Sequence, residues 1–144
     1  MRKFLRLLAF CSAPLLMAAL ESPANASAPS SDIKTGADLV AACHATLGGD
    51  SSEAGRVSAA ACNQFLAGMV VAVYNATEAG QPTVLHRLGP DGSQSVCFRL
   101  PKFLKYQEFA AIAVDYAKSH PELNELPAVE LAGRSLADKY PCKE

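Results

Sequence analysis

The stretch CNQFLAGMVVAV at residues 62–73 determines the class of the fold. Its larger apolar side chains recur at intervals of three and four residues, which places them on one face of an α-helix. They are Cys62, Phe65, Leu66, Met69, Val70 and Val73. Ser58 is a suitable N-cap, so we predict a helix over residues 59–78. Because glycine within a helix costs about 1 kcal/mol relative to alanine, Gly68 should make a close contact, inside the domain or, less favoured, across a dimer interface.

Three further helices are predicted around this one. A helix over residues 36–47 begins at a capping box formed by Thr35 and Asp38. Another begins near residues 102–104 and ends at Ser119, because His120 precedes a proline and so disfavours helical geometry. The last begins at Pro127 and ends before Pro141. The side chains expected to face the core are Leu39, Val40, Cys43, Leu47, Phe109, Ile112, Ala113, Tyr116, Val129, Ala132, Leu136 and Tyr140.

Residues 80–96 form the least regular segment. Gly89-Pro90-Asp91-Gly92 is a strong turn signal, and residues 83–85 and 95–97 on either side are compatible with a short hairpin. We treat the segment as a long loop between the second and third helices. The predicted fold is therefore all-α: a small four-helix domain made of two antiparallel helical hairpins.

The N-terminus has the three parts of a secretory signal peptide. Basic residues at 2, 3 and 6 precede an apolar run over residues 7–20, and Ala24-Asn25-Ala26 forms a cleavage site. We predict a signal peptide over residues 1–26, cleavage between Ala26 and Ser27, a flexible segment over 27–34 and a periplasmic domain over 35–144. An uncleaved anchor is disfavoured because the apolar run is shorter than the roughly 20 residues a spanning helix needs. Lipidation at Cys11 is disfavoured because Phe10 precedes it.

Four cysteines remain after cleavage: Cys43, Cys62, Cys97 and Cys142. An even count in a short exported chain indicates disulfides, and the wide spacing disfavours a zinc site. An antiparallel hairpin of the first two helices would bring Cys43 to Cys62, and one of the last two would bring Cys97 to Cys142. We predict these two pairs among three possible connectivities.

Composition argues against several functions. The mature chain carries ten basic and thirteen acidic residues, a net charge of −3, and has no basic stripe for nucleic acid. Polar Asn63 and Gln64 interrupt its most apolar run, so we expect no membrane contact after cleavage. Common hydrolase, metalloprotease and phosphate-loop motifs are absent, and the three histidines are dispersed along the chain. We expect no enzyme activity, no cofactor and no metal.

Binding is the function that remains. The 80–96 segment carries His86, Arg87, Asp91 and Gly92 around its turn, which is typical of a recognition loop on a rigid scaffold. A plain solvent-exposed connector would have a similar composition, so both interpretations stay open.

Two groups of motifs carry a family resemblance. The first half contains Thr35-Gly36-x-Asp38-Leu39-Val40-x-x-Cys43 and Cys62-x-x-Phe65-Leu66-x-Gly68-Met69-x-x-Ala72. The second contains Cys97, Leu100-Pro101, Tyr116, His120-Pro121-Glu122, Leu126-Pro127-Ala128 and a closing Tyr140-Pro141-Cys142. Together they resemble the Rap/Tai-type immunity proteins over nearly the whole mature chain. The Cys97-to-Pro101 spacing and Glu108 depart from the family pattern, so the identity of a cognate toxin is not carried over.

The resemblance implies a periplasmic helical protein that binds a peptidoglycan-cleaving amidase effector of type VI secretion and occludes its active site, often as a homodimer. A periplasmic acid-stress chaperone of the HdeA kind, also small, helical and disulfide-linked, is the alternative. A small hydrolase is a more remote third hypothesis.

Overall fold

The computed structural model describes residues 32–77 and 80–142. In chain order these form α1 (Gly36–Gly48), α2 (Glu53–Ala76), β1 (Thr83–Leu88), β2 (Gln94–Phe98), α3 (Tyr106–Ser119), the 3-10 helix η1 (Pro121–Glu125) and α4 (Ala128–Lys139). The predicted signal peptide, its cleavage site at Ala26 and Ser27, and most of the predicted flexible segment lie outside the described residues.

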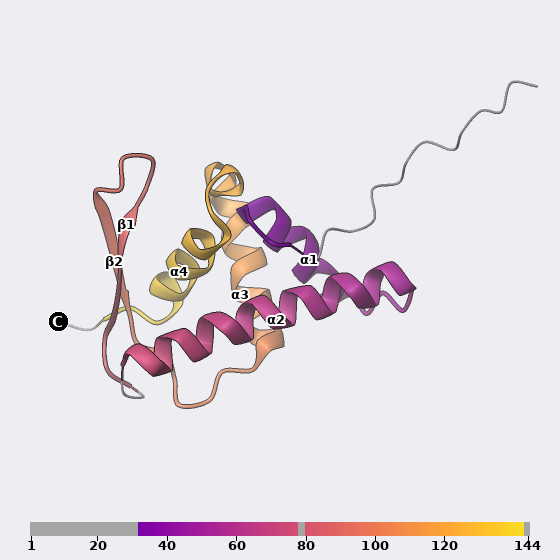
Figure 1. Cartoon of the computed structure of the whole chain (residues 1–144), viewed down its shortest axis with the longest axis horizontal. Coiled ribbons are helices and arrows are strands. Elements are labelled where there is room, and N and C mark those ends of the chain that lie inside the picture. Colours follow the sequence, from indigo (N-terminus) through magenta and orange to yellow (C-terminus); the bar gives the residue numbers. More distant parts are fainter. Residues whose placement is uncertain (1–31, 78–79, 143–144) are drawn as a thin grey trace, which may run out of the picture.

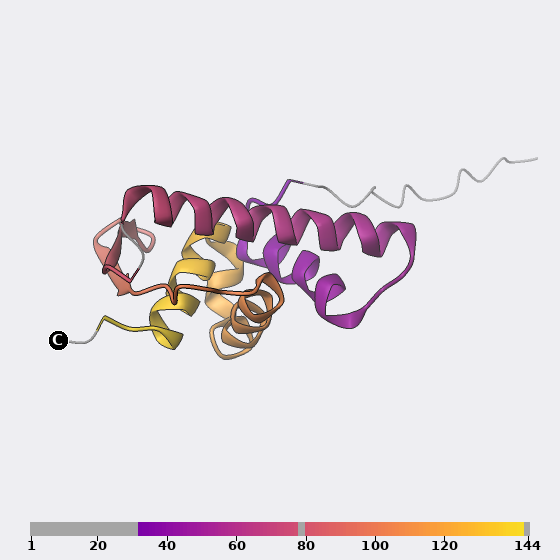
Figure 2. The ribbon, with the colours of Figure 1, turned by 90° about the horizontal axis from the view of Figure 1, so that it is seen from below.

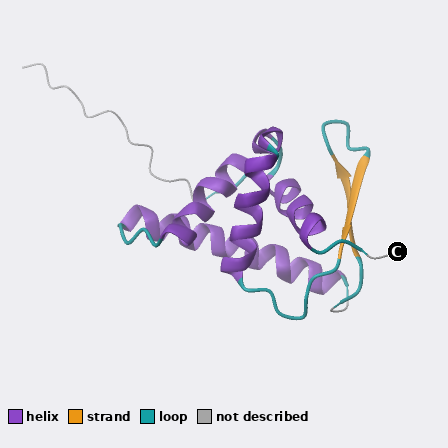
Figure 3. Cartoon of the chain, turned by 180° about the vertical axis from the view of Figure 1, so that it is seen from behind, coloured by secondary structure: helices purple, strands orange, loops and turns teal. Residues whose placement is uncertain are grey.

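The all-α prediction is wrong, because β1 and β2 pair as an antiparallel two-stranded sheet. The pairs Thr83–Phe98, Val84–Cys97 and Leu85–Val96 set the register. The hairpin stands at one end of the molecule beside α4, and its turn projects away from α2 (Figures 1 and 3). Residues 83–85 and 95–97, which the sequence marked as compatible with a short hairpin, lie within these two strands, so the error was to treat the segment as a long loop. A two-stranded hairpin depends on packing against the rest of the domain for its stability, and the sequence does not show that packing.

The helices form a single cluster rather than two separate hairpins. α1 contacts α2, α3, α4 and η1, and α3 also contacts both α2 and α4. The long α2 extends across one side of the group, with the other helices beneath it (Figure 2). The fully buried large side chains at the centre are Leu39, Leu66, Phe98, Phe109, Leu131 and Leu136.

The start of α1 is tied to the start of α4. Thr35 and Asp38 form the predicted capping box. Beside it, Gly36 N donates to Leu126 O at 2.8 Å and Ala128 N donates to Lys34 O at 2.8 Å. A Cβ on Gly36 would collide with the carbonyl of Leu123, so glycine permits this close approach. These contacts join two segments that are far apart in the sequence.

Several element boundaries and buried faces differ from prediction. α2 begins at Glu53 rather than residue 59, because Ser52 is its N-cap and accepts a hydrogen bond from Gly55 N at 3.0 Å. The first turns of α2 lack the apolar period on which the sequence argument depended. Leu47 and Val129, expected in the core, are 41% and 47% exposed. The prediction that His120-Pro121 ends the third helix is confirmed, since α3 stops at Ser119.

By length and composition, α2 is the helix among the described residues that could cross a membrane. Its most apolar stretch has a mean hydropathy of 1.5, and about a third of that stretch is buried. The buried face includes Cys62, Leu66, Met69, Val70 and Val73. A core helix of a folded domain has the same length and hydropathy, so these properties are weak evidence for a membrane span.

Both cysteine pairs match the prediction. Cys43 is bonded to Cys62 with a Cα–Cα distance of 5.1 Å, and Cys97 to Cys142 with a Cα–Cα distance of 5.5 Å. The first bridge is fully buried between α1 and α2. The second joins β2 to the segment after α4, where Cys142 N also donates to Cys97 O at 3.4 Å.

Candidate functional site

The segment predicted to be a recognition loop is the β1–β2 hairpin. A bulge interrupts its ladder, because Leu85 pairs with Val96 and Leu88 with Gln94, which leaves two residues of β1 opposite one of β2. The two residues are His86 and Arg87, both exposed. The bulge therefore turns these side chains outward close to the tip of the hairpin.

Arg87 has a left-handed backbone, with φ of 62°. This region is unfavourable for a residue with a Cβ atom and is commonly occupied by glycine. Gly92 lies directly against Arg87, since a Cβ on Gly92 would be 3.8 Å from the Cβ of Arg87. The structure thus brings together two of the predicted binding residues at a conformationally strained point.

The other two predicted residues also lie on the exposed hairpin. The His86 ring nitrogen Nδ1 is 3.1 Å from the Ser95 hydroxyl across the strands. The Asp91 carboxylate accepts hydrogen bonds from the hydroxyl and the backbone N–H of Ser93 at the turn. These bonds hold the pKa of Asp91 below its ordinary value, and the bond from the Ser93 hydroxyl has the largest effect. Asp91 therefore presents a negative charge at neutral pH.

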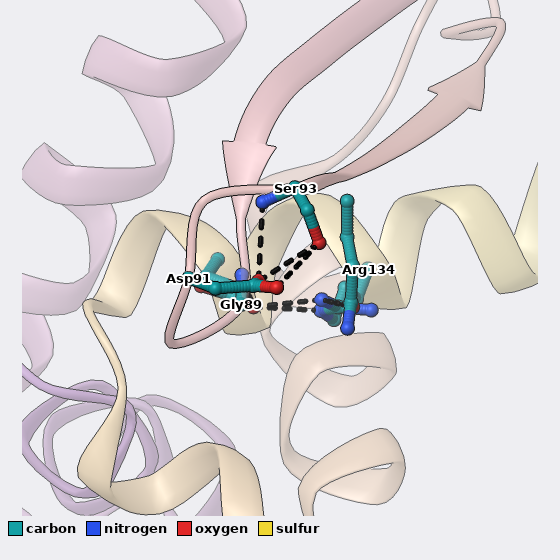
Figure 4. A network of polar contacts seen from close by, with 6 residues as sticks. Gly89, Asp91, Ser93 and Arg134 are labelled. Atoms are coloured by element: carbon teal, nitrogen blue, oxygen red, sulfur yellow. Dashed lines mark hydrogen bonds and ion pairs between the residues drawn. The ribbon is translucent and has the colours of Figure 1, made fainter.

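The turn is closed by its own backbone and held from below by α4. Gly92 N donates to Gly89 O at 3.1 Å, and Gly89 N donates to the Glu130 side chain at 2.8 Å. Figure 4 shows Gly89, Asp91 and Ser93 of the turn beside Arg134 of α4. Sequence analysis missed Glu130 and Arg134. Their four-residue spacing indicates an ion pair, but nothing in the sequence places that pair beneath the turn.

An apolar groove of about 520 Å³ lies beside the hairpin, between α2 and β1. Gly68, Ala72 and Ala76 of α2 line it together with Val84 of β1 and Val129 of α4. Gly68 faces open space, because a Cβ at this position would have no neighbour within 4 Å. The favoured prediction that Gly68 makes a close contact inside the domain is therefore wrong.

A second, more polar hollow lies between α3 and α4 and is lined by Tyr116, Ser119, His120, Ser135 and Asp138, among others. His120 Nδ1 lies 3.0 Å from the Tyr116 carbonyl oxygen, and the Ser135 hydroxyl donates to the Ala132 carbonyl at 2.8 Å. Burial is the main cause that raises the pKa of Tyr116, and the negative charge of Asp138 raises it further. Serine and histidine here are bonded to backbone rather than to each other, unlike a nucleophile with its base.

Metal ligation has no evident location in the described part of the chain. Within residues 32–77 and 80–142, no three side chains of His, Cys, Asp or Glu gather in an arrangement that could hold a metal ion. His44 is an exposed residue of α1 beside the first disulfide. The outward-facing polar groups of the hairpin remain the best candidate site.

The fold and this site define a class of protein: a disulfide-linked helical scaffold that presents a β-hairpin. Comparison with protein families gives the particular family. Residues 35–142 match the model of the Rap1a immunity proteins, and the chain belongs to that family. No curated protein and no solved structure matches the chain. Membership indicates the role of an immunity protein, which binds a cognate effector toxin.

Proposed function

We propose that this protein is exported to the periplasm and there neutralises a peptidoglycan-cleaving amidase effector of type VI secretion. The hairpin enters the active-site groove of the effector and blocks access of the substrate. The protein acts by binding, not by catalysis. The observation that carries the proposal is the exposed hairpin, whose outward polar residues lie on a turn fixed to a disulfide-linked core.

The chemistry of the tip fits a polar cleft. His86 and Arg87 at the bulge of β1, and Asp91 in the turn that follows, offer a ring nitrogen, a guanidinium and a carboxylate near the tip of the hairpin. An arginine can form paired hydrogen bonds with a carboxylate, and an ionised aspartate accepts hydrogen bonds from backbone or side-chain donors. Such groups give specificity when they are held in one geometry before binding.

The experiment is inhibition of a purified amidase effector encoded beside this gene, with affinity measured by calorimetry. The double variant His86→Ala/Asp91→Ala should reduce affinity at least about tenfold, since hydrogen bonds to charged groups contribute about 1.5–3 kcal/mol. His44→Ala/Glu53→Ala, with the same types of change at exposed positions on α1 and α2, is the matched control and should bind normally. Absence of binding to any neighbouring effector would refute the immunity function. Full binding by the hairpin variant would refute the role of the hairpin.

Export is tested separately. The mature protein should be recovered from the periplasmic fraction and should begin at Ser27 on N-terminal sequencing. Retention of residues 1–26, or modification at Cys11, would contradict the proposed cleavage.

Self-association is part of the same proposal. The groove beside Gly68 is apolar, and small residues on α2 allow another chain to approach its backbone closely. Ala72→Glu in the groove should convert a homodimer to a monomer in sedimentation experiments. Ala60→Glu, the same change at an exposed position of α2 outside the groove, should leave the dimer intact. A monomeric unmodified protein would refute this part of the proposal.

The groove also favours a second candidate, a periplasmic acid-stress chaperone, because exposed apolar surface is what such a protein offers its clients. In strongly acidic solution a chaperone should suppress aggregation of a denatured client protein. An inactive protein under those conditions would exclude this candidate.

A further inference from the structure

One face of α4 supports the hairpin. Glu130, Gly133 and Arg134 occupy positions i, i+3 and i+4, which lie on the same side of a helix. All three are oriented toward β1, β2 or the turn between them. Glu130 and Gly133 are buried.

The Glu130 side chain binds the backbone of the turn. Its Oε1 atom accepts hydrogen bonds from Gly89 N at 2.8 Å and from Arg134 Nε and Nη2 at 2.9 and 2.8 Å. The residue is only 4% exposed. A buried carboxylate is unfavourable unless it is paired and hydrogen-bonded, and the Glu130 side chain has both an arginine and the Gly89 backbone N–H as partners.

Arg134 reaches the other side of the turn. Its Nη2 atom also donates to the side-chain oxygen of Gln94, the first residue of β2. Gly89 follows β1, so the Glu130–Arg134 ion pair contacts the chain where it leaves one strand and where it enters the next. The turn is therefore held at both ends by one helix.

Gly133 leaves room for a side chain of β1. A Cβ added to Gly133 would overlap the Cδ1 methyl at the far end of Leu85, so the Leu85 side chain would have to shift. Glycine within a helix is less favourable than alanine by about 1 kcal/mol, and the close contact with Leu85 gives a physical reason for it here. The side chain of Leu85 is partly buried against the core.

We propose that Glu130, Gly133 and Arg134 are positioning residues that hold the hairpin in its binding conformation. The effector then meets His86, Arg87 and Asp91 in the conformation that they already have in the free protein. Glu130 and Gly133 are buried, so they act through the hairpin rather than by contact with the effector. Preorganisation raises affinity by lowering the entropy lost when a loop is ordered on binding. The inference rests on the proposed function for its consequence in binding, but the positioning itself is a property of the free protein.

The principal test variant is Glu130→Met/Arg134→Met. It removes both charges together, since removing one alone would leave an unpaired charge in a largely buried place. Asp115→Asn/Lys118→Met is the matched control, because it removes an exposed ion pair of 2.7 Å from α3. The rate of hydrogen exchange at the Gly89 N–H in the free protein reports how firmly the turn is held against α4. Calorimetry and association kinetics with the amidase effector report its consequence.

We expect the principal variant to speed exchange at Gly89 and to lower affinity, each at least about tenfold, as expected for loss of a hydrogen bond to a charged group. Part of the loss should be in the association rate, and urea unfolding should remain cooperative. The control variant should change none of these measurements. Unchanged exchange at Gly89 would overturn the positioning role, and faster exchange with undiminished affinity would overturn its role in binding.

Gly133→Ala provides an independent test if the double variant fails to fold. It should also weaken binding, and Gly133→Ala/Leu85→Val should recover part of the loss because the shorter side chain makes room for the added methyl group. Equal affinity for Gly133→Ala and the unmodified protein would contradict the inference. If the unmodified protein binds no effector, the proposed function fails, while exchange at Gly89 still decides whether α4 holds the turn.

Discussion

Cys97 and Cys142 join the second strand of the hairpin to the segment that follows α4, with their Cα atoms 5.5 Å apart. The same region contains a hydrogen bond from Arg99 N to Tyr140 O at 2.9 Å and a bridge between Phe98 and Pro141. The Cys97–Cys142 disulfide, together with these backbone contacts, therefore fixes the base of the hairpin. Glu130 and Arg134 hold its turn. Cys43–Cys62, in contrast, joins two core helices.

The two disulfides should differ in their effects on stability and binding. Their sequence separations are 19 and 45 residues. Restriction of the unfolded chain predicts that Cys43→Ala/Cys62→Ala lowers the free energy of unfolding by about 3 kcal/mol and Cys97→Ala/Cys142→Ala by about 4 kcal/mol. Urea unfolding measures both losses. Only the second variant should also increase hydrogen exchange selectively in β2, and a uniform increase would contradict the local role assigned to that bridge.

Gly68→Ala should stabilise the monomer by up to about 1 kcal/mol. The new methyl group meets no atom within 4 Å and improves the helix propensity of α2. Gly36→Ala is the contrasting variant: its Cβ would collide with backbone, so it should lower stability. Thermal or urea unfolding distinguishes the two. A lower stability of the Gly68→Ala monomer would contradict the open space beside Gly68.

Arg87→Gly should increase stability by up to about 1 kcal/mol while weakening effector binding. Glycine adopts the left-handed backbone without the steric cost that the arginine Cβ incurs. The loss of the guanidinium removes a candidate contact with the partner. Urea unfolding and calorimetry on the same preparation measure the two effects. Arg87→Lys separates them, because it retains both the strain and a positive charge.

The capping box at the start of α1 should make stability depend on pH. Hydrogen bonds from the backbone and side chain of Thr35, and from the backbone of Lys34, hold the pKa of Asp38 below its ordinary value of 3.8. Folding therefore favours the ionised form. The stabilisation is complete above the unfolded-state pKa and is lost as pH falls through the lower folded-state pKa.

Asp38→Asn should remove this dependence. The stability difference between the unmodified protein and Asp38→Asn, measured by urea unfolding, should be largest near neutral pH and should shrink below pH 3.8. Thr35→Ala should lower stability by about 1 kcal/mol, whereas Thr35→Ser retains the capping oxygen and should have little effect. A stability difference for Asp38→Asn that is constant across this range would contradict the assigned cause.

Local patterns predicted much of the scaffold. Capping by Thr35 and Asp38, the apolar period of 62–73 and the stop at His120-Pro121 depend on neighbouring residues, so sequence alone located four helices. The helix ends near Cys43 and Cys62 gave a sound reason for the first pair, whereas the second pair was predicted correctly although Cys97 lies in β2 rather than beside a helix end. Boundaries failed where the local pattern was weak, as at the start of α2, where exposed first turns carry no apolar period.

The candidate site was only partly predictable. The turn signal located Asp91 and Gly92, and composition indicated His86 and Arg87. Residues 83–85 and 95–97 were compatible with a short hairpin, but the sequence did not decide between that hairpin and a long loop. Two short strands are stable here because α4 supplies Glu130, Arg134 and a surface without a side chain at Gly133. These residues are about forty positions away from the turn that they hold, and a contact over that separation leaves no local pattern.

The sequence by itself determined the helical scaffold, its disulfides and the position of the exposed turn, because helix periodicity, caps and turns are set by nearby residues. Tertiary structure alone decided that the hairpin compatible with the sequence forms, over residues 83–88 and 94–98, that Gly68 faces an open groove and that a buried ion pair fixes the hairpin. Each of these depends on which surfaces meet after the chain has folded, and burial, unlike local conformation, is a property of the whole domain.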